Sequence, residues 1–158
     1  MNSLNHFLIS VGLLLLLYNQ QATINEILIF ALIFGVLVDL DVFIKIVLNK
    51  KAEHHRTWLQ EPLGIVLIGI PLGLLLSAVK PYYFFLAVVP YLAHVVLDYL
   101  TLHKVRPLAP FSKKQMEVGF FRPSPNAKWL QGKNKGYSEN YFLLLNVILL
   151  MLIIRVIY

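Results

Sequence analysis

Residues 82–102 read YYFFLAVVPYLAHVVLDYLTL, and this stretch decides how the whole chain is interpreted. It is long enough to cross a bilayer, because a spanning helix needs about 20 mostly apolar residues. The same stretch nevertheless carries His94 and Asp98. Ionisable side chains inside a bilayer are costly and are usually kept for function. The stretch therefore predicts a membrane helix that contains part of a functional site.

Other apolar runs of similar character lie on both sides of this stretch. The chain has 158 residues, of which 58% are hydrophobic, and a mean hydropathy of +0.70. Further candidate spans lie at residues 24–48, 62–79 and 141–157, and a shorter one at 7–17. We predict an all-α fold, a polytopic membrane helical bundle of about five helices with a short first helix. Residues 1–158 would form a single integral membrane domain.

The distribution of basic residues predicts the orientation of this domain. Twelve of the fourteen lysines and arginines fall on one side of the predicted helices, leaving Lys80 and Arg155 on the other. The positive-inside rule makes the basic side cytoplasmic. We expect an inner (plasma) membrane protein with a cytoplasmic N-terminus, a basic cytoplasmic loop at 103–140 and an external C-terminus. The net charge of +6 could attract anionic headgroups or phosphorylated substrates, or could only set the topology.

The acidic residues and histidines gather on the same side. All five histidines and seven of the eight acids lie toward the cytoplasmic ends of the predicted helices. His94 and Asp98 are four residues apart and so share a helix face, as metal ligands in helical bundles do. Asp98 could be a ligand, or could orient His94. The chain has no cysteine, so any metal would be bound through nitrogen and oxygen.

Two further segments add candidate groups. Asp39 and Asp41 diverge on an ideal helix, so both reach one centre only if the helix loosens there. We interpret Asp39 as a ligand and Asp41 as a ligand or base, although Asp41 could merely mark the helix end. Glu61 precedes Pro62 and could act in catalysis or only at a helix N-terminus. Arg56, beside His54 and His55, has the planar fork that binds two phosphate oxygens.

The order of these blocks resembles a known family. Asp39-Leu-Asp41, His55-Arg56, His94-Val-Val-Leu-Asp98-Tyr-Leu-Thr101 and Pro107-Leu-Ala-Pro-Phe-Ser112 are similar to the small inner-membrane metal-dependent hydrolases first known from a LexA-associated bacterial member. The resemblance covers about residues 1–115. It implies that His6 belongs to the site, because the first helix of the family typically opens with a histidine.

The chain also departs from the family pattern. Val38 stands where the family usually has proline, and Gln60 stands where a second histidine follows the His-Arg block. His54, Gln60 or Glu61 could substitute for that histidine. The expected metal ligands are thus His6, Asp39, Asp41, His55, His94 and Asp98.

Two classes of function fit these residues. The first is a membrane-bound metal-dependent hydrolase acting on a phosphoester or lipid-like substrate at the cytoplasmic interface, with one or two divalent ions, zinc or manganese, as cofactor. Its catalytic residues would be Asp41, Arg56 and Glu61, and its phosphate contacts would be Arg56, Arg106, Lys113 and Lys114. The second is a non-catalytic divalent metal binder or carrier. The expected partners are the lipid bilayer and an anionic or phosphorylated amphiphile, with no nucleic acid.

Overall fold

The computed structural model describes residues 3–39, 58–100 and 137–158, with short pieces at 104–105, 107–108, 111–112, 114, 116–117 and 121–122. The helices are α1 (Ser3–Tyr18), α2 (Ile24–Gly35), α4 (Pro62–Gly64), α5 (Ile70–Ser77), α6 (Tyr83–Tyr99) and α7 (Glu139–Ile157). A π-helical turn, Ile65–Gly69, joins α4 and α5, and 3-10 turns occur at Leu37–Asp39 and Trp58–Gln60. The described chain is helical apart from four short strands, as the sequence predicted.

The strands are two residues long and form two small ladders. β1 (Lys104–Val105) pairs antiparallel with β2 (Met116–Glu117), and β3 (Phe121–Arg122) pairs parallel with β4 (Tyr137–Ser138). They lie within the predicted loop at 103–140, most of which is outside the described residues. The cytoplasmic placement of that loop, and the single domain spanning 1–158, remain predictions.

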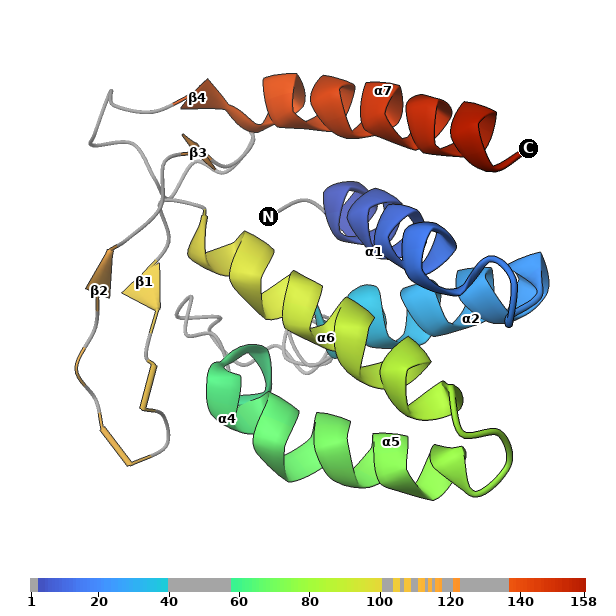
Figure 1. The fold of residues 1–158 in the computed structure, drawn as a ribbon. Helices are drawn as coiled ribbons and strands as arrows, with labels where there is room; N and C mark the ends of the chain where they lie inside the picture. The colour runs from blue at the N-terminus through green and yellow to red at the C-terminus, as the bar shows by residue number, and fades with distance from the viewer. Residues whose placement is uncertain are drawn as a thin grey trace.

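Helix α6 is the centre of the bundle. It packs against α1, α2 and α5, and α7 packs against α1 on the outside (Figure 1). The ends of α2 and α6 and the beginnings of α1 and α7 lie at the same end of the bundle, next to the strands (Figure 1). This arrangement brings together residues that are far apart in the sequence. We call this the histidine end of the molecule.

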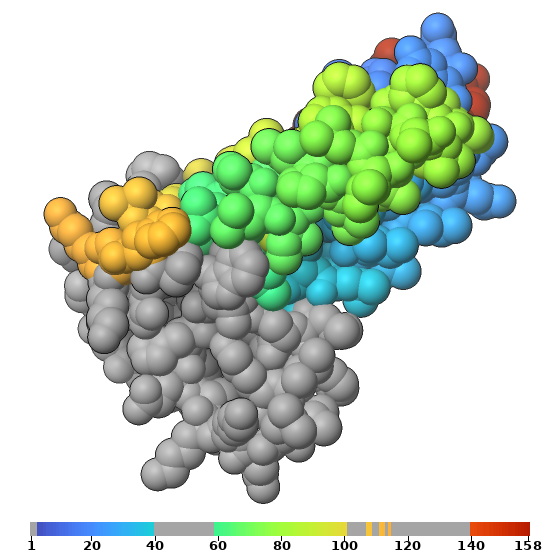
Figure 2. Space-filling view, turned by 90° about the horizontal axis from the view of Figure 1, so that it is seen from below, coloured from blue at the N-terminus to red at the C-terminus, as the bar shows by residue number. Residues whose placement is uncertain are grey.

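The bundle has an apolar core besides the buried polar residues of the histidine end, and its outer helix faces are apolar as well. Leu14, Ala31, Leu86 and Ala87 are fully buried where α1, α2 and α6 meet. Figure 2 shows α4 and α5 lying along one face of the bundle with α2 beside them. Leucine and isoleucine side chains nevertheless remain exposed on α2, α5 and α7. Such surfaces suit a lipid environment better than water.

Only α7 meets the length expected of a spanning helix among the described residues. Its segment Asn140–Ile157 is 18 residues long and apolar enough to cross a membrane. Three other apolar helical segments, Ser3–Tyr18, Pro62–Ser77 and Tyr83–Tyr99, are shorter.

Two glycines explain how α5 approaches α6. A Cβ added at Gly69 would lie 2.8 Å from Cδ1 of Tyr91, and one added at Gly73 would lie 3.1 Å from Cδ2 of Phe84. The backbone of this segment therefore lies directly against aromatic rings of α6. This is the close packing that a small-xxx-small pattern predicts.

The predicted helix at 24–48 is wrong in its extent. α2 begins with a capping box between Thr23 and Glu26, but it ends at Gly35. The N–H of Asp39 donates to the carbonyl of Val36, 3.0 Å away, so the chain tightens into a 3-10 turn. Asp39 therefore does not lie on an α-helix. The Asp39–Asp41 spacing required the helix to loosen, whereas the structure shows a tighter 3-10 turn at Asp39. Asp41 lies outside the described residues, so its placement beside Asp39 stays a prediction.

An ion pair lies at the opposite end of the bundle, which we call the Glu26 end. Nζ of Lys80, in the connection between α5 and α6, lies 2.6 Å from Oε1 of Glu26. The hydroxyl of Tyr83 donates to the same oxygen at 2.5 Å, and the N–H of Thr23 donates to Oε2 at 2.8 Å. The contacts of Glu26 with Lys80 and Tyr83 join the start of α2 to the start of α6 and the connection before it. They also place Lys80 away from the histidine end, as the sequence predicted.

Candidate metal centre

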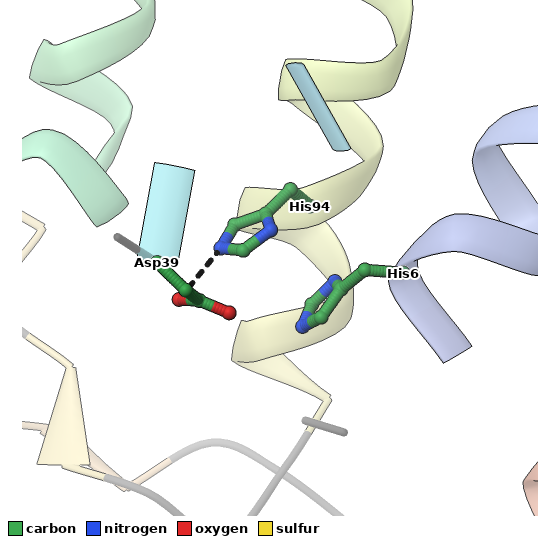
Figure 3. Close-up of side chains that lie close together, drawn as sticks. All are labelled: His6, Asp39 and His94. Atoms are coloured by element: carbon green, nitrogen blue, oxygen red, sulfur yellow. Dashed lines mark ion pairs between the residues drawn. The ribbon is translucent and has the colours of Figure 1, made fainter. Parts of the chain in front are cut away.

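Three potential metal ligands meet at the histidine end. His6 comes from the start of α1, Asp39 from the 3-10 turn after α2, and His94 from α6. One ligand atom from each lies within 4.8 Å of the others. Figure 3 shows the three side chains converging from these separate elements.

Asp98 connects the two histidines. Its Oδ1 lies 3.2 Å from Nε2 of His6, and its Oδ2 lies 3.6 Å from Nε2 of His94. Oδ1 of Asp39 lies 3.4 Å from the same nitrogen of His94. The i, i+4 spacing on α6 therefore does bring His94 and Asp98 together, and His6 and Asp39 complete a group of two imidazoles and two carboxylates.

The backbone of Gly35 fixes the tautomer of His94. The distance from Nδ1 of His94 to the carbonyl oxygen of Gly35 is 2.8 Å. A carbonyl can only accept a hydrogen bond, so Nδ1 carries the proton. In the neutral ring, Nε2 therefore presents its lone pair toward Asp39 and Asp98. A histidine oriented through its other nitrogen in this way is typical of metal ligands.

The two imidazole rings are buried and stacked. Their centroids are 4.0 Å apart, and both side chains are fully excluded from solvent. Among the described residues, neither ring nitrogen of His6 nor Nε2 of His94 has a hydrogen-bond partner. Buried polar atoms without partners are uncommon and call for an explanation such as an ion. Protonating both rings would place two positive charges face to face, whereas one divalent cation could be shared by both lone pairs.

The spacing of the donor atoms agrees with this explanation. Two ligand atoms, each about 2.1 Å from a tetrahedral ion, lie ~3.4 Å apart. The three separations between histidine nitrogens and carboxylate oxygens are 3.2, 3.4 and 3.6 Å. The residues present therefore fit a divalent metal bound through nitrogen and oxygen. A set of this kind suits zinc or manganese without distinguishing them.

Gln60 orients Asp39. Its Nε2 donates to Oδ1 of Asp39 at 2.8 Å, and Gln60 is itself almost fully buried. The side chain of Asp39 is 29% exposed, whereas those of His6, His94 and Asp98 are buried. Solvent can therefore reach the group of candidate ligands from the side on which Asp39 lies. Gln60, which occupies the position of a histidine in the resembled family, contacts a candidate ligand in this chain.

Glu61 is not merely a helix cap. It occupies the N-cap position of α4, but its side chain makes no capping hydrogen bond. The carboxylate instead accepts a hydrogen bond from the hydroxyl of Tyr99 at 2.7 Å, and the residue is 1% exposed. Glu61 is therefore a buried carboxylate that lies next in sequence to Gln60 and is held by a hydrogen bond from α6.

Several predicted site residues lie outside the described part of the chain. They are Asp41, His54, His55, Arg56, Arg106 and Lys113. Lys114 is described and exposed; its N–H donates to the hydroxyl of Ser112 at 3.2 Å. Its predicted phosphate contact stays a prediction.

Sequence reasoning missed two residues that shape the centre. Gly35 contributes only a backbone carbonyl, for which a sequence gives no signal. Tyr99 follows Asp98 directly and could have been noticed as a hydrogen-bond donor at the same helix end. Both act on the candidate ligands or on Glu61 without being ligands themselves.

Comparison with known proteins identifies the family. No curated protein and no solved structure matches the chain. The family described as YdjM inner membrane protein matches it over residues 1–158, so the match includes the part beyond residue 115 in which no motif was found. This agrees with the resemblance noted in the sequence, and an inner-membrane family agrees with the apolar helix faces. The chain belongs to the YdjM inner membrane protein family.

Proposed function

We propose that this chain is a multi-pass membrane hydrolase whose metal centre, His6, Asp39, His94 and Asp98, acts at the cytoplasmic interface. One observation carries the proposal. Nε2 of His94 is buried and has no hydrogen-bond partner among the described residues. Its lone pair, whose direction is fixed by the Gly35 carbonyl at the other ring nitrogen, faces the carboxylates of Asp39 and Asp98. A divalent cation relieves this arrangement, and catalytic metal sites are built from such ligands.

In the proposed membrane arrangement, α7 and the shorter apolar helices cross the bilayer together. α7 is long enough to span, and α1, α6 and the Pro62–Ser77 run would cross beside it. Two basic residues are predicted to be external, Lys80 in the connection between α5 and α6 and Arg155 in the last turn of α7. The connection between α5 and α6 and the C-terminal end of α7 lie at the end of the bundle away from the start of α1 (Figure 1). The positive-inside rule would then place the histidine end in the cytoplasm.

The residues around the centre would have separate roles in orienting the ligands and in catalysis. The Gly35 carbonyl holds His94 in the correct tautomer, and Gln60 fixes Asp39. When bound, a divalent ion would supply Lewis acidity, which polarises an ester and activates water. Glu61, held by Tyr99, is the proposed general base, with Asp41 as a second carboxylate.

The proposed substrate is an amphiphile with a phosphoester. The position of the centre at one end of the bundle favours a substrate that reaches it from the membrane interface. Arg56, Arg106, Lys113 and Lys114 would bind its negative charge, Arg56 through two hydrogen bonds at once. A carrier would more commonly bind its ion near the membrane midplane, between repeated halves.

The test compares Arg56→Lys with the unaltered chain in detergent micelles containing zinc or manganese. Substrates would be membrane lipids and isoprenoid phosphates, assayed by release of phosphate or headgroup. We expect Arg56→Lys to lower turnover roughly 10- to 100-fold, because one charge-assisted hydrogen bond is worth about 1.5–3 kcal/mol. Metal content should not change. Arg155→Lys, at the opposite end, is the matched control and should behave like the unaltered chain.

Two outcomes would contradict the proposal. If none of these substrates is cleaved while reconstituted liposomes accumulate the metal, the chain is a carrier. If Arg56→Lys lowers metal content as much as turnover, Arg56 supports the centre and does not bind the substrate.

A further inference from the structure

Helix α7 contributes no candidate ligand, yet it is attached to α1 beside the centre. Nδ2 of Asn146 donates to Oδ1 of Asn5 at 2.9 Å, across 141 positions of sequence. Asn5 is fully buried and Asn146 is 3% exposed. Asn5 directly precedes the candidate ligand His6.

Asn146 is exceptional on its helix. From residue 142 to residue 154, α7 is apolar except for this asparagine. Among residues 140–158, Asn146 is also the only buried side chain. An amide that is buried in an otherwise exposed apolar helix is costly unless it has a partner. Its burial therefore points to a specific contact and not to general packing.

Apolar contacts also hold α1 and α7 together, but contacts of this kind favour one register only weakly. A Cβ added at Gly12 would lie 3.4 Å from Cδ1 of Ile153 and 3.9 Å from Cδ1 of Leu150. Such apolar contacts are weakly directional, and in lipid there is little hydrophobic drive between helices. A single buried amide, by contrast, can specify the register of a helix pair.

We infer that the Asn5–Asn146 hydrogen bond sets the register of α7 against α1 and thereby holds His6 in its position at the centre. Asn146 is then a positioning residue, which acts through Asn5 and α1. The part of this inference that concerns metal binding rests on the proposed function, whereas the part that concerns helix register does not.

The absence of cysteine from the natural sequence allows a direct test of the register. Cysteines would be placed at Gly12 and Ile153, to report the native register, and at Gly12 and Ile157, to report a shift of one turn. Disulfide formation would be measured in membranes after mild oxidation. The test variant is Asn5→Leu with Asn146→Leu, because replacing both partners leaves no buried unpaired amide and so favours folding.

We expect the double variant to lose at least fivefold in cross-linking of the native pair and to gain cross-linking of the shifted pair. The metal dissociation constant should rise roughly tenfold, as for the loss of a group that orients a ligand. Asn146→Gln keeps the amide donor and should restore both properties at least in part. Asn140→Leu makes the same change at an exposed position of α7 and should alter neither.

The results separate this inference from the proposed function. Native cross-linking in the double variant would overturn the inference. A shifted register with unchanged metal affinity would also overturn it, because α7 would then not hold His6. If the unaltered chain binds no metal, the proposed function fails, and modification of His6 by diethyl pyrocarbonate decides the inference instead. Protection of His6 that is lost in the double variant would support it, and protection that persists would overturn it.

Discussion

The two ends of the helix bundle both hold a carboxylate network, but they complete it in different ways. At the Glu26 end, one carboxylate receives donors from Lys80, Tyr83 and Thr23. At the histidine end, Asp39 and Asp98 face imidazole nitrogens, and three ring nitrogens of His6 and His94 have no hydrogen-bond partner among the described residues. The carboxylate oxygens of Glu26 thus have their hydrogen-bond donors within the protein. The histidine end has the donor set of a cation site, so the comparison separates a structural contact from a candidate functional one.

The largest expected difference is topological, because the two ends should lie on opposite sides of the membrane. Single cysteines at Lys133 and Tyr158 would be treated with an impermeant thiol reagent on whole cells. We expect labelling at Tyr158→Cys and none at Lys133→Cys. A cysteine at Asn49 should behave like the one at Lys133. The reverse pattern would overturn the assignment of the histidine end to the cytoplasm.

The next largest effect should come from removing a ligand. His94→Ala or Asp39→Ala should weaken metal binding by more than the roughly 10- to 100-fold that loss of an orienting group costs. Elemental analysis of protein purified in detergent would measure this. Glu26→Gln alters the carboxylate at the other end and should keep the metal. Unchanged stoichiometry in both ligand variants would remove the centre.

Acidification should weaken metal binding at the histidine end and leave the ion pair at the Glu26 end in place. Protonated imidazole cannot bind a metal, so affinity should fall on the order of 100-fold from pH 8 to pH 5, through the ordinary histidine range near ~6.5. The hydrogen bond to Glu26 raises the pKa of Lys80 above its usual value, so this lysine stays charged throughout. The contribution of Lys80 to the free energy of unfolding is complete below the pKa of lysine in the unfolded chain, and it is lost only as pH rises through the raised pKa of the folded state. Titration of metal content at constant zinc, with melting temperature as control, would test this contrast.

Substitution of Gln60 should have a smaller effect on metal affinity than the loss of a ligand. Gln60→Leu removes the donor to Asp39 and should weaken metal binding roughly tenfold. Gln60→His introduces the imidazole of the resembled family and should strengthen it. Competition with a chromophoric chelator would measure both variants. Equal affinities in all three proteins would show that Gln60 does not act on the centre.

The smallest effect should be that of Glu26→Gln on stability. The neutral amide keeps some hydrogen bonds but loses the ion pair with Lys80, which is 46% exposed and therefore screened. We expect the melting temperature in detergent to fall by only a few degrees. Lys80→Met should give a similar decrease. A loss of metal from either variant would mean that the two ends are coupled.

The sequence by itself determined the class of protein and the side chains at issue. Apolar runs longer than a soluble core needs, together with His94 and Asp98 on one helix face, predicted a helical membrane protein with a site at one end. The family match over the whole chain and the grouping of His6, Asp39 and His94 agree with this. These features were readable because helix periodicity and hydropathy are local properties of a sequence.

Only the tertiary structure decided where α2 ends and which groups orient the ligands. The Gly35 carbonyl binds His94 from another helix, and the Asn5–Asn146 bond joins positions at opposite ends of the chain. Both depend on how α1, α2, α6 and α7 pack, and no short stretch of residues encodes that packing. The 3-10 turn Leu37–Asp39 likewise interrupts a run that hydropathy alone predicts as one helix, because hydropathy measures the preference for lipid and not the backbone path.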